Sequence, residues 1–247
     1  MSDRMKPMRT RLGGLDAIVL EPSEKGSVVA NVVLSHGFGA PGEDLVGLAP
    51  ELSHVAPGLA EKVRWIFPAA PLSLAELGYG GGRAWWHLDM ERLALGRDWD
   101  TYVDEVPEGL PKARRAYLAL LEELQTNTKV PLSRTVLGGF SQGAMLSTDV
   151  TLRLEEAPLG LCALSGALIS RAAWEERAPK RSGLHVFQSH GRQDPILPYA
   201  VAERLRALFE SAKMTVRFEP FSGPHTIPVS VLQKLAVWLT ERVEQVR

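Results

Sequence analysis

Residues 134–143 read RTVLGGFSQG, and this short stretch indicates how the chain folds. Residues 135–137 have the β-branched and apolar character of a buried strand, and helix-forming residues resume at Gln142. Between the two, Ser141 has one glycine two residues before it and another two residues after it. The pattern predicts a strand that turns sharply into a helix, with the serine hydroxyl exposed at the turn.

Outward from this stretch, strand-like and helix-like runs alternate along the chain. This alternation predicts an α/β fold with a mostly parallel central sheet and helices on both faces. The expected strands are 27–37, 63–71, 134–140, 159–166, 185–191 and 215–221. The expected helices are 43–56, 107–125, 142–154, 171–177, 199–212 and 229–246.

The length and composition are those of an ordinary globular protein. The chain has 247 residues, of which 45% are hydrophobic and 23% charged, and α/β proteins of this size often form one domain. We expect a single domain over 1–247, with a flexible N-terminal segment at 1–14. Residues 72–105 are rich in glycine and hold three of the six tryptophans, so we expect an active-site loop region there.

The charge balance and the single cysteine exclude several classes of partner. With 28 basic and 29 acidic residues, the chain has no positive excess to neutralise a nucleic-acid backbone. Cys162 has no second cysteine for a disulfide or a metal site, so we expect a small buried hydrophobic residue. The N-terminal segment lacks the apolar core of a secretory signal, and no run is long enough for a membrane span. We therefore expect a cytoplasmic protein.

A serine hydroxyl at a strand–helix turn is a weak nucleophile unless a base activates it and an acid orients the base. At turns of this kind the acid and then the histidine follow the serine in the chain. His185 and His190 begin and end one expected strand, and no well-placed acid precedes them. Elimination leaves His225 as the base. Asp194, in the loop directly after that strand, is the expected acid, because site residues collect at this edge of a parallel sheet.

Other acids also follow Ser141, and the selected residues have ordinary alternatives. Asp149, Glu155 and Glu156 lie on or just past the expected helix after Ser141, so they point along it rather than toward a strand end. The alternatives for the selected pair are a helix-capping acid at position 194 and a surface histidine at 225. The agreement of serine, acid and histidine in chain order and loop position favours the catalytic interpretation.

A nucleophilic serine at such a turn also needs backbone donors for the oxyanion that develops when it attacks a carbonyl group. The N–H of Gln142, at the start of the helix, is one candidate. The stretch LSHGFGA at 34–40 follows another buried strand, and its glycines allow the backbone to approach a ligand closely. The Phe38 N–H is the second candidate, and we expect His36 to fix this loop rather than to react.

At this point the chain resembles a known family. The motifs LSHGFGA, FPAAP, GRAWW, GGFSQGAMLS, LSGALI, HGRQDPILPY and GPHTIP occur in the order typical of the phospholipase/carboxylesterase family. The resemblance covers about residues 27–240. It implies an α/β-hydrolase fold without a large cap domain, no cofactor, and hydrolysis of carboxylic esters or thioesters. It also implies Ser141, Asp194 and His225 as catalytic residues, with the Phe38 and Gln142 amides as the oxyanion hole.

We therefore expect a serine hydrolase that cleaves esters or thioesters of small to medium acyl groups through an acyl-enzyme intermediate. The alternatives are a lysophospholipase or acyl-protein thioesterase for long acyl chains, and a hydrolase-fold binding protein without catalysis. No H-E-x-x-H spacing indicates a metal site. We expect a small-molecule substrate and no nucleic-acid partner, and the sequence leaves a homodimer open.

Trp85 and Trp86 are the expected substrate-binding residues. They lie in YGGGRAWWHLD, a loop that follows the second expected strand. Adjacent residues of an extended segment face opposite ways. We therefore expect one indole to pack into the body of the protein and the other to line the acyl pocket, the alternative being that both only anchor the loop.

Overall fold

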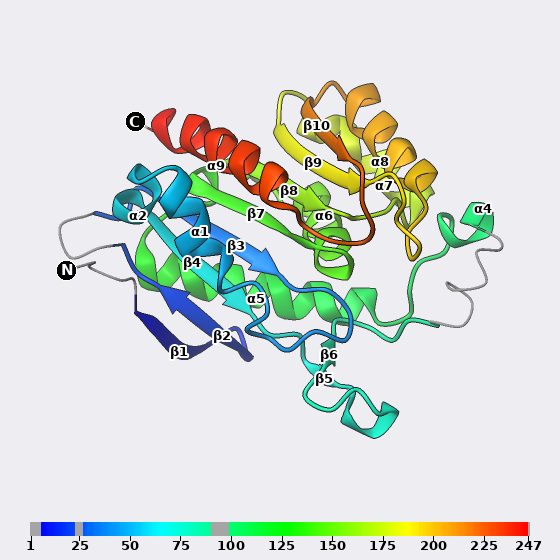
Figure 1. The fold of residues 1–247 in the computed structure, drawn as a ribbon, viewed down its shortest axis with the longest axis horizontal. Helices are drawn as coiled ribbons and strands as arrows, with labels where there is room; N and C mark the ends of the chain where they lie inside the picture. Colours follow the sequence, from blue (N-terminus) through cyan, green and yellow to red (C-terminus); the bar gives the residue numbers. More distant parts are fainter. Residues whose placement is uncertain (1–5, 23–26, 90–98, 247) are drawn as a thin grey trace.

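The computed structural model describes residues 6–22, 27–89 and 99–246, and its centre is an eight-stranded sheet (Figure 1). The strand order is β1-β2-β4-β3-β7-β8-β9-β10. All neighbours from β4 to β10 are parallel, whereas β2 runs antiparallel to β4 and β1 antiparallel to β2. The predicted mostly parallel α/β sheet is confirmed, and one antiparallel hairpin extends it at one edge.

The sheet strands are β1 (Pro7–Leu12), β2 (Leu15–Leu20), β3 (Ala30–Ser35), β4 (Val63–Pro68), β7 (Thr135–Phe140), β8 (Gly160–Leu164), β9 (His185–Gly191) and β10 (Thr215–Phe221). A separate small hairpin contains β5 (Leu72–Ser73) and β6 (Arg83–Ala84). The helices are α1 (Leu48–Val55), α2 (Gly58–Lys62), α4 (Trp99–Tyr102), α5 (Leu110–Thr128), α6 (Gln142–Arg153), α7 (Arg171–Arg177), α8 (Tyr199–Ser211) and α9 (Val229–Glu244). Short 3-10 turns occupy Ala75–Leu77, Leu132–Arg134 and Ala178–Arg181.

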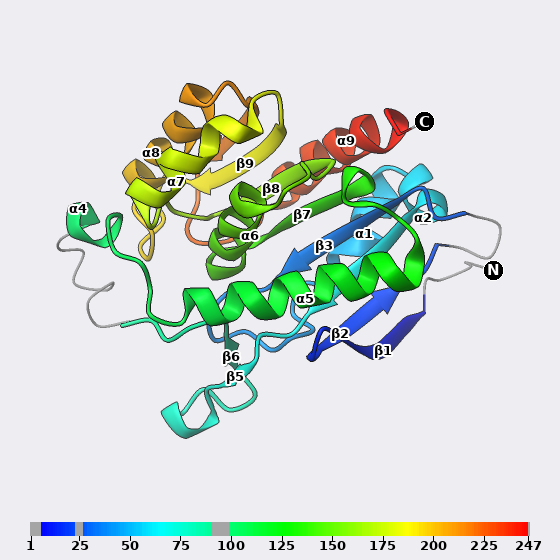
Figure 2. The same ribbon diagram turned by 180° about the vertical axis from the view of Figure 1, so that it is seen from behind.

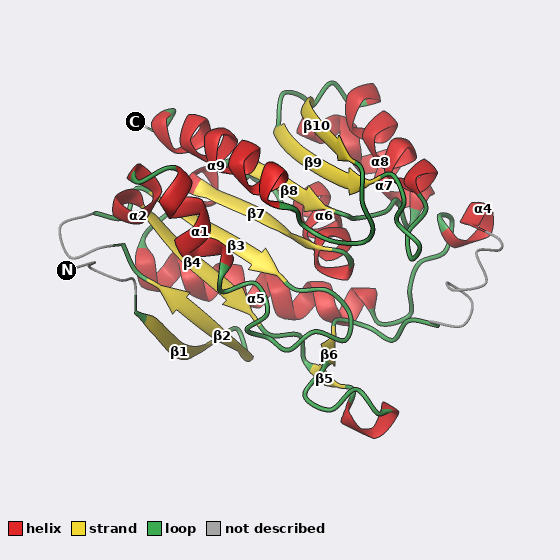
Figure 3. Ribbon diagram, in the orientation of Figure 1, coloured by secondary structure: helices red, strands yellow, loops and turns green. Residues whose placement is uncertain are grey.

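Helices cover both faces of the sheet, which lies between them as a middle layer (Figure 3). Helices α1, α2 and α9 lie on the face seen in Figure 1, and α5, α6, α7 and α8 lie on the face seen in Figure 2. Each strand supplies both cores, because successive side chains point to opposite faces. On β7, Val136 packs into the core under α1 and α9, and Leu137 into the core under α5 and α6.

The N-terminal segment differs from the prediction. The sequence predicts flexibility over 1–14, but residues 7–12 form β1, which pairs with β2 from Leu12↔Leu15 to Pro7↔Leu20. The two-residue connection consists of Gly13 and Gly14, with φ angles of 57° and 80°. Positive φ at both central residues is the requirement of a tight type I′ hairpin, and glycine meets it without strain.

Helix α1 also differs, because it begins at Leu48 rather than at residue 43. A helix from residue 43 would place Pro50 in its interior, where the ring clashes with the preceding turn and the N–H is missing. Residues 42–47 form turns instead, and Pro50 falls in the first helical turn, where it is tolerated.

The predicted loop region at 72–105 contains β5, a 3-10 turn, β6 and α4, but its residues 90–98 lie outside the described residues. Two described residues of this region, Leu88 and Tyr102, lie beside Ser141 at the carboxyl end of β7. Within the described ranges, no helix combines the length and the apolar character needed to cross a membrane.

Candidate active site

Ser141 occupies the sharp turn between β7 and α6, with φ 54° and ψ −118°. This conformation is costly for a residue with a side chain, so the surrounding structure must hold it in place. The glycines on either side make the turn possible. A Cβ atom at Gly139 would lie 2.4 Å from the Ser35 carbonyl oxygen, and one at Gly143 would lie 2.0 Å from the same atom. Only glycine fits at either position, because the end of β3 packs against both.

Asp194 and His225 come from two neighbouring strand ends. Asp194 follows β9, His225 follows β10, and the His225 Nδ1 atom lies 2.6 Å from Asp194 Oδ2. The other carboxylate oxygen, Oδ1, accepts hydrogen bonds from the N–H groups of Ile196 and Leu197, both at 2.9 Å. The carboxylate is therefore bound on both oxygens, and it can hold the His225 ring in one orientation.

The two loops that carry this pair are joined to each other. The Gln193 N–H donates to the Gly223 carbonyl at 3.1 Å. A Cβ atom at Gly191 would lie 2.4 Å from the Gly223 oxygen and 2.3 Å from the Pro224 oxygen. The absence of a side chain at Gly191 lets the β10 loop cross directly over the end of β9, which brings His225 within reach of Asp194.

The environment of Asp194 keeps its carboxyl group ionised. Burial alone would raise the pKa of this group. The hydrogen bond with His225 and the backbone N–H groups of Leu197 and Ile196 outweigh burial, so the pKa of Asp194 lies below its ordinary value. Near neutral pH an anion therefore faces the His225 ring and favours a proton on that ring during the reaction.

Ser141 and His225 meet at one pocket of about 110 Å³. The His225 ring packs beside Phe140, with ring centroids 4.7 Å apart. The pocket wall is mainly apolar and is formed by Gly37, Phe38, Ala40, Asp44, Leu88, Tyr102, Phe140, Met145, Ile196 and Leu197. The structure thus brings the predicted nucleophile and base to one cavity and places the predicted acid behind the base.

The loop after β3 approaches the nucleophile closely. A Cβ atom at Gly37 would lie 3.3 Å from the Ser141 Cβ, and Phe38 lines the pocket. Within the described ranges, neither the Phe38 nor the Gln142 backbone N–H has a hydrogen-bond partner. Both predicted oxyanion donors are therefore free to bind a ligand, and the Gln142 N–H lies at the positive end of α6.

His36 fixes this loop, as the sequence predicts. The ring is buried, its Nε2 atom accepts a hydrogen bond from the Ala70 N–H at 2.9 Å, and its Nδ1 atom lies 2.8 Å from the Gly37 carbonyl. Because a carbonyl only accepts, the proton is on Nδ1. Burial lowers the pKa of His36, so the ring stays neutral while it links the two loops.

The side chain of Gln142 has a structural role that the sequence analysis did not identify. Its Oε1 atom accepts from the Trp85 N–H at 2.9 Å, and its Nε2 atom donates to the Trp86 carbonyl at 2.8 Å. The side chain is completely buried. The side chain of Gln142 thus binds the backbone of the loop at Trp85 and Trp86, while its own backbone N–H is the candidate oxyanion donor.

The prediction for Trp85 and Trp86 requires correction. The exposed fractions of these residues are 1% and 0%, and neither lines the pocket that holds Ser141. The Trp85 indole N–H donates to the His36 carbonyl at 3.0 Å. The Cβ of Trp86 lies so near the start of α5 that a Cβ at Gly109 would be 2.5 Å away. Both indoles support the loop, and Trp86 also lines a neighbouring cavity of about 340 Å³. Leu88, which the prediction missed, reaches the pocket of Ser141.

Asp149 occupies the place that the sequence analysis assigned to it, along α6 and away from the site. It is fully buried and lies 2.7 Å from Arg114 and 3.1 Å from Arg153. The Trp174 indole N–H completes its contacts at 2.9 Å. These partners give Asp149 a structural role.

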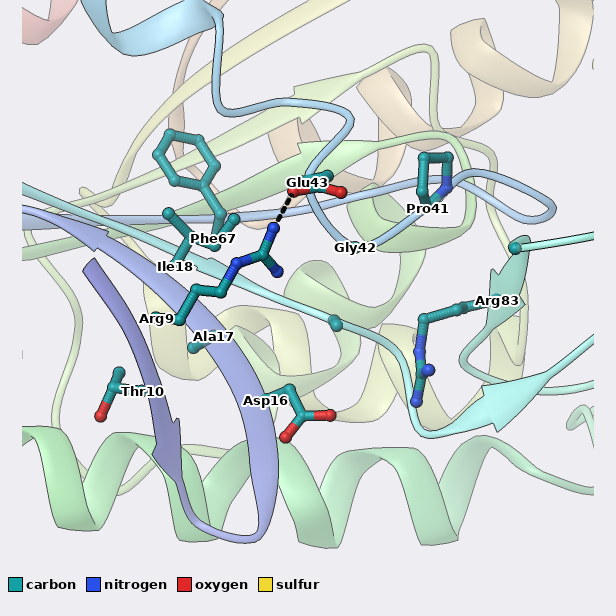
Figure 4. A pocket seen from close by; sticks show the side chains of 12 residues that line it. Arg9, Thr10, Asp16, Ala17, Ile18, Pro41, Gly42, Glu43, Phe67 and Arg83 are labelled. Carbon is teal, nitrogen blue, oxygen red and sulfur yellow. Dashed lines mark hydrogen bonds and ion pairs between the residues drawn. The ribbon is translucent and has the colours of Figure 1, made fainter. Parts of the chain in front are cut away.

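A second cavity of about 320 Å³ lies between the β1–β2 hairpin, the end of β4 and residues 41–43 (Figure 4). Its wall carries charges of both signs, including Arg83, Asp16 and the Arg9–Glu43 ion pair at 2.7 Å. It shares no lining residue with the pocket of Ser141. Across the described part of the chain, no group of three or more His, Cys, Asp or Glu side chains could hold a metal ion.

Comparison with known proteins agrees with this arrangement. The Phospholipase/Carboxylesterase family model matches residues 16–242. Acyl-protein thioesterase 1 of Candida albicans is 26% identical over 208 residues, which cover 82% of this chain and 87% of the relative. Acyl-protein thioesterase 1 of Emericella nidulans is 30% identical over 179 residues, covering 71% and 73%. The crystal structure of esterase PE8 superimposes with a TM-score of 0.74 and 27% identity, over 92% of this chain and 98% of that one.

These matches and the sheet define an α/β-hydrolase fold, with no large cap domain evident. The chain belongs to the phospholipase/carboxylesterase family, and it is a serine hydrolase of esters or thioesters. The predicted fold, family and class of reaction are confirmed.

Proposed function

We propose that the protein cleaves esters or thioesters of small to medium acyl groups through an acyl-enzyme intermediate on Ser141. His225 acts as the general base, and Asp194 orients it. The observation that carries this proposal is the 2.6 Å contact between His225 and Asp194, next to a strained serine that shares a pocket with the histidine. A strained serine, a histidine and a buried carboxylate in this order supply the groups that acyl transfer requires.

The reaction proceeds in two halves. His225 Nε2 takes the proton of the Ser141 hydroxyl as its oxygen attacks the carbonyl carbon of the substrate. The N–H groups of Phe38 and Gln142 bind the negative oxygen of the tetrahedral intermediate. His225 then returns the proton to the leaving alcohol or thiol, and the acyl group stays on Ser141. Water repeats the sequence and releases the carboxylic acid.

The size of the pocket supports small to medium acyl groups. The cavity at Ser141 is about 110 Å³, and Leu88 and Tyr102 close it on one side. A neighbouring cavity of about 340 Å³ lies beyond the same two residues. A long acyl chain, as in the alternative of a lysophospholipase or acyl-protein thioesterase, would need these side chains to move apart. The thioesterase names of the relatives favour a thioester as the natural bond.

The first test is the variant Ser141→Ala, assayed with p-nitrophenyl esters from C2 to C16, an acyl thioester and a lysophospholipid. We expect kcat to fall by about 10⁴ or more, because the nucleophile is lost. A matched control is Ser170→Ala, because Ser170 also has positive φ (49°) and also precedes a helix, whereas it does not line the pocket of Ser141.

Mass spectrometry after treatment with a fluorophosphonate would show one adduct in the wild type and in Ser170→Ala and none in Ser141→Ala. Near-native turnover by purified Ser141→Ala would refute the proposal. The rate profile across the panel decides between short and long acyl groups. A single domain, a cytoplasmic location and a homodimer stay predictions.

A further inference from the structure

A second histidine, His190, lies against the carboxylate of Asp194. It is the penultimate residue of β9 and is completely buried. Its Nε2 atom lies 2.8 Å from the Leu197 carbonyl oxygen and 3.3 Å from Asp194 Oδ2. This is the same carboxylate oxygen that His225 contacts.

The contacts of His190 fix the position of its proton. A carbonyl oxygen and an ionised carboxylate only accept hydrogen bonds, so Nε2 must carry the hydrogen. The other ring nitrogen, Nδ1, is buried and has no partner within the described residues. The ring is therefore a neutral donor whose N–H binds the Leu197 carbonyl, and Asp194 Oδ2 lies 3.3 Å from the same nitrogen.

The groups around His190 favour this neutral form. Burial is the largest effect and lowers the pKa of His190, and His225 lowers it further. The Leu197 carbonyl and Asp194 raise the pKa, but by less. The centres of the His190 and Tyr199 rings lie 6.3 Å apart. The Arg192 guanidinium lies over the Tyr199 ring, 4.9 Å from its centre. The net effect is a pKa of His190 below the ordinary value for histidine, which favours the neutral ring.

We propose that His190 is a positioning residue for the catalytic carboxylate, through an N–H that is held by the Leu197 carbonyl and lies beside Asp194 Oδ2. This inference rests on the proposed function. Asp194 accepts three hydrogen bonds, from the Ile196 and Leu197 amides on Oδ1 and from His225 on Oδ2. The protonated Nε2 of His190 lies 3.3 Å from Oδ2, so the positive end of its N–H bond adds a fourth electrostatic contact that favours this orientation of the carboxylate.

The His190 N–H should also make Asp194 less basic, because the positive end of a dipole beside the charged form stabilises that form. A less basic carboxylate holds the proton on His225 less firmly. Loss of the His190 donor should therefore raise the affinity of His225 for its proton. The acid limb of the pH profile of kcat/KM, which reports protonation of the base in the free enzyme, should then move to higher pH.

The test compares His190→Leu, which removes the donor, with His190→Gln, whose side-chain amide can place an N–H near the same position. We expect His190→Leu to move the acid limb upward by about half a pH unit and to lower kcat about tenfold with little change in KM. We expect His190→Gln to restore the wild-type profile and part of kcat. An unchanged acid limb in a folded His190→Leu variant, or no difference between the two variants, would overturn the proposal.

A second measurement uses the wild-type protein and does not depend on either variant folding. Nitrogen-15 correlation spectra of the histidine rings should show the His190 proton on Nε2 and no titration of this ring between about pH 5 and 8. A proton on Nδ1, or a ring that titrates in this range, would refute the role. The tautomer of His190 is measured without substrate. A wrong tautomer would therefore refute only the role of His190, whereas an active Ser141→Ala variant would refute the proposed function itself.

Discussion

Asp149 and Asp194 are both buried aspartates, yet their surroundings differ in kind. Asp149, in the middle of α6, contacts two arginines and an indole N–H. Asp194, in the loop after β9, contacts backbone amides and imidazole rings. Arginine is permanently charged, whereas imidazole can gain or lose a proton near neutral pH. The first carboxylate can only compensate charge, and the second can take part in proton transfer.

The comparison shows that burial and charge do not by themselves identify a catalytic acid. The informative feature is a partner that can change its protonation state and that also reaches a cavity. His225 meets both conditions, because it contacts Asp194 and lines the pocket with Ser141. Substitutions at the two aspartates should therefore separate activity from stability.

The largest effect is expected for Asp194→Asn. The amide preserves the shape and one acceptor oxygen, but it has no negative charge and does not hold His225 in the required tautomer. We expect kcat to fall by about 10⁴, with a melting temperature within a few degrees of the wild type. Steady-state kinetics and thermal unfolding on the same preparation measure both. An activity loss of less than about tenfold would remove Asp194 from the proposed mechanism.

The opposite result is expected for Asp149→Asn. Loss of the charge leaves Arg114 and Arg153 facing a buried site without an anion, which should cost about 3 kcal/mol of unfolding free energy. For a chain of this length that is a fall in Tm of roughly 6–12 °C. The rate per folded molecule should change little.

The control for Asp149→Asn is Asp104→Asn, which breaks an exposed ion pair with Arg171 and should cost less than about 1 kcal/mol. Denaturant unfolding compares the two. If Asp149→Asn instead abolished turnover at unchanged stability, the structural role assigned to Asp149 would be wrong. The two aspartates would then not differ in function.

Ser141, Asp194 and His225, the proposed catalytic residues, could be selected from the sequence because their positions follow from chain order and sheet geometry. The glycines around Ser141 require the sharp turn, and residues that follow neighbouring parallel strands meet at one edge. The β1–β2 hairpin was predictable in principle from Gly13-Gly14 between two strand-like runs. The expectation of a flexible segment over 1–14 did not use this short signal.

The orientation of the tryptophans was not predictable in the same way. In an irregular loop, the direction of a side chain depends on residues distant in sequence, here Gln142 and the start of α5. The alternation that orders side chains on a strand does not apply to residues 85–88, of which the structure assigns none to a strand. The position of His190 beside Asp194 likewise depends on how the loop folds back onto β9.

Gln142→Ala sharpens the comparison by separating the backbone of one residue from its side chain. The backbone N–H of Gln142 remains available for the oxyanion, so the effect on kcat should be less than about tenfold. The Trp85 N–H and the Trp86 carbonyl lose their partners, which should cost about 1–3 kcal/mol. Thermal unfolding and kinetics together test this division. A loss of activity as large as that of Ser141→Ala, with normal stability, would show that the side chain itself takes part in the reaction.

The smallest effect is expected at Leu88, which extends the comparison from charged to apolar residues. Leu88 lies two residues after Trp86 in the same loop, but it is only half-buried and borders both the pocket of Ser141 and the neighbouring cavity. In Leu88→Ala the partition between the two cavities becomes thinner, so a longer acyl chain gains room without any change at the proposed catalytic residues. One extra or missing methylene group in an apolar pocket changes kcat/KM by roughly 10–200-fold, and a partial opening should shift the ratio of kcat/KM for C8 over C4 esters by about 3–10-fold. The matched control is Leu77→Ala, which removes a 59% exposed leucine of the same loop region that borders neither cavity. If both variants keep the wild-type chain-length profile, the wall at Leu88 does not limit the acyl group, and the size of the natural substrate must be set elsewhere in the pocket.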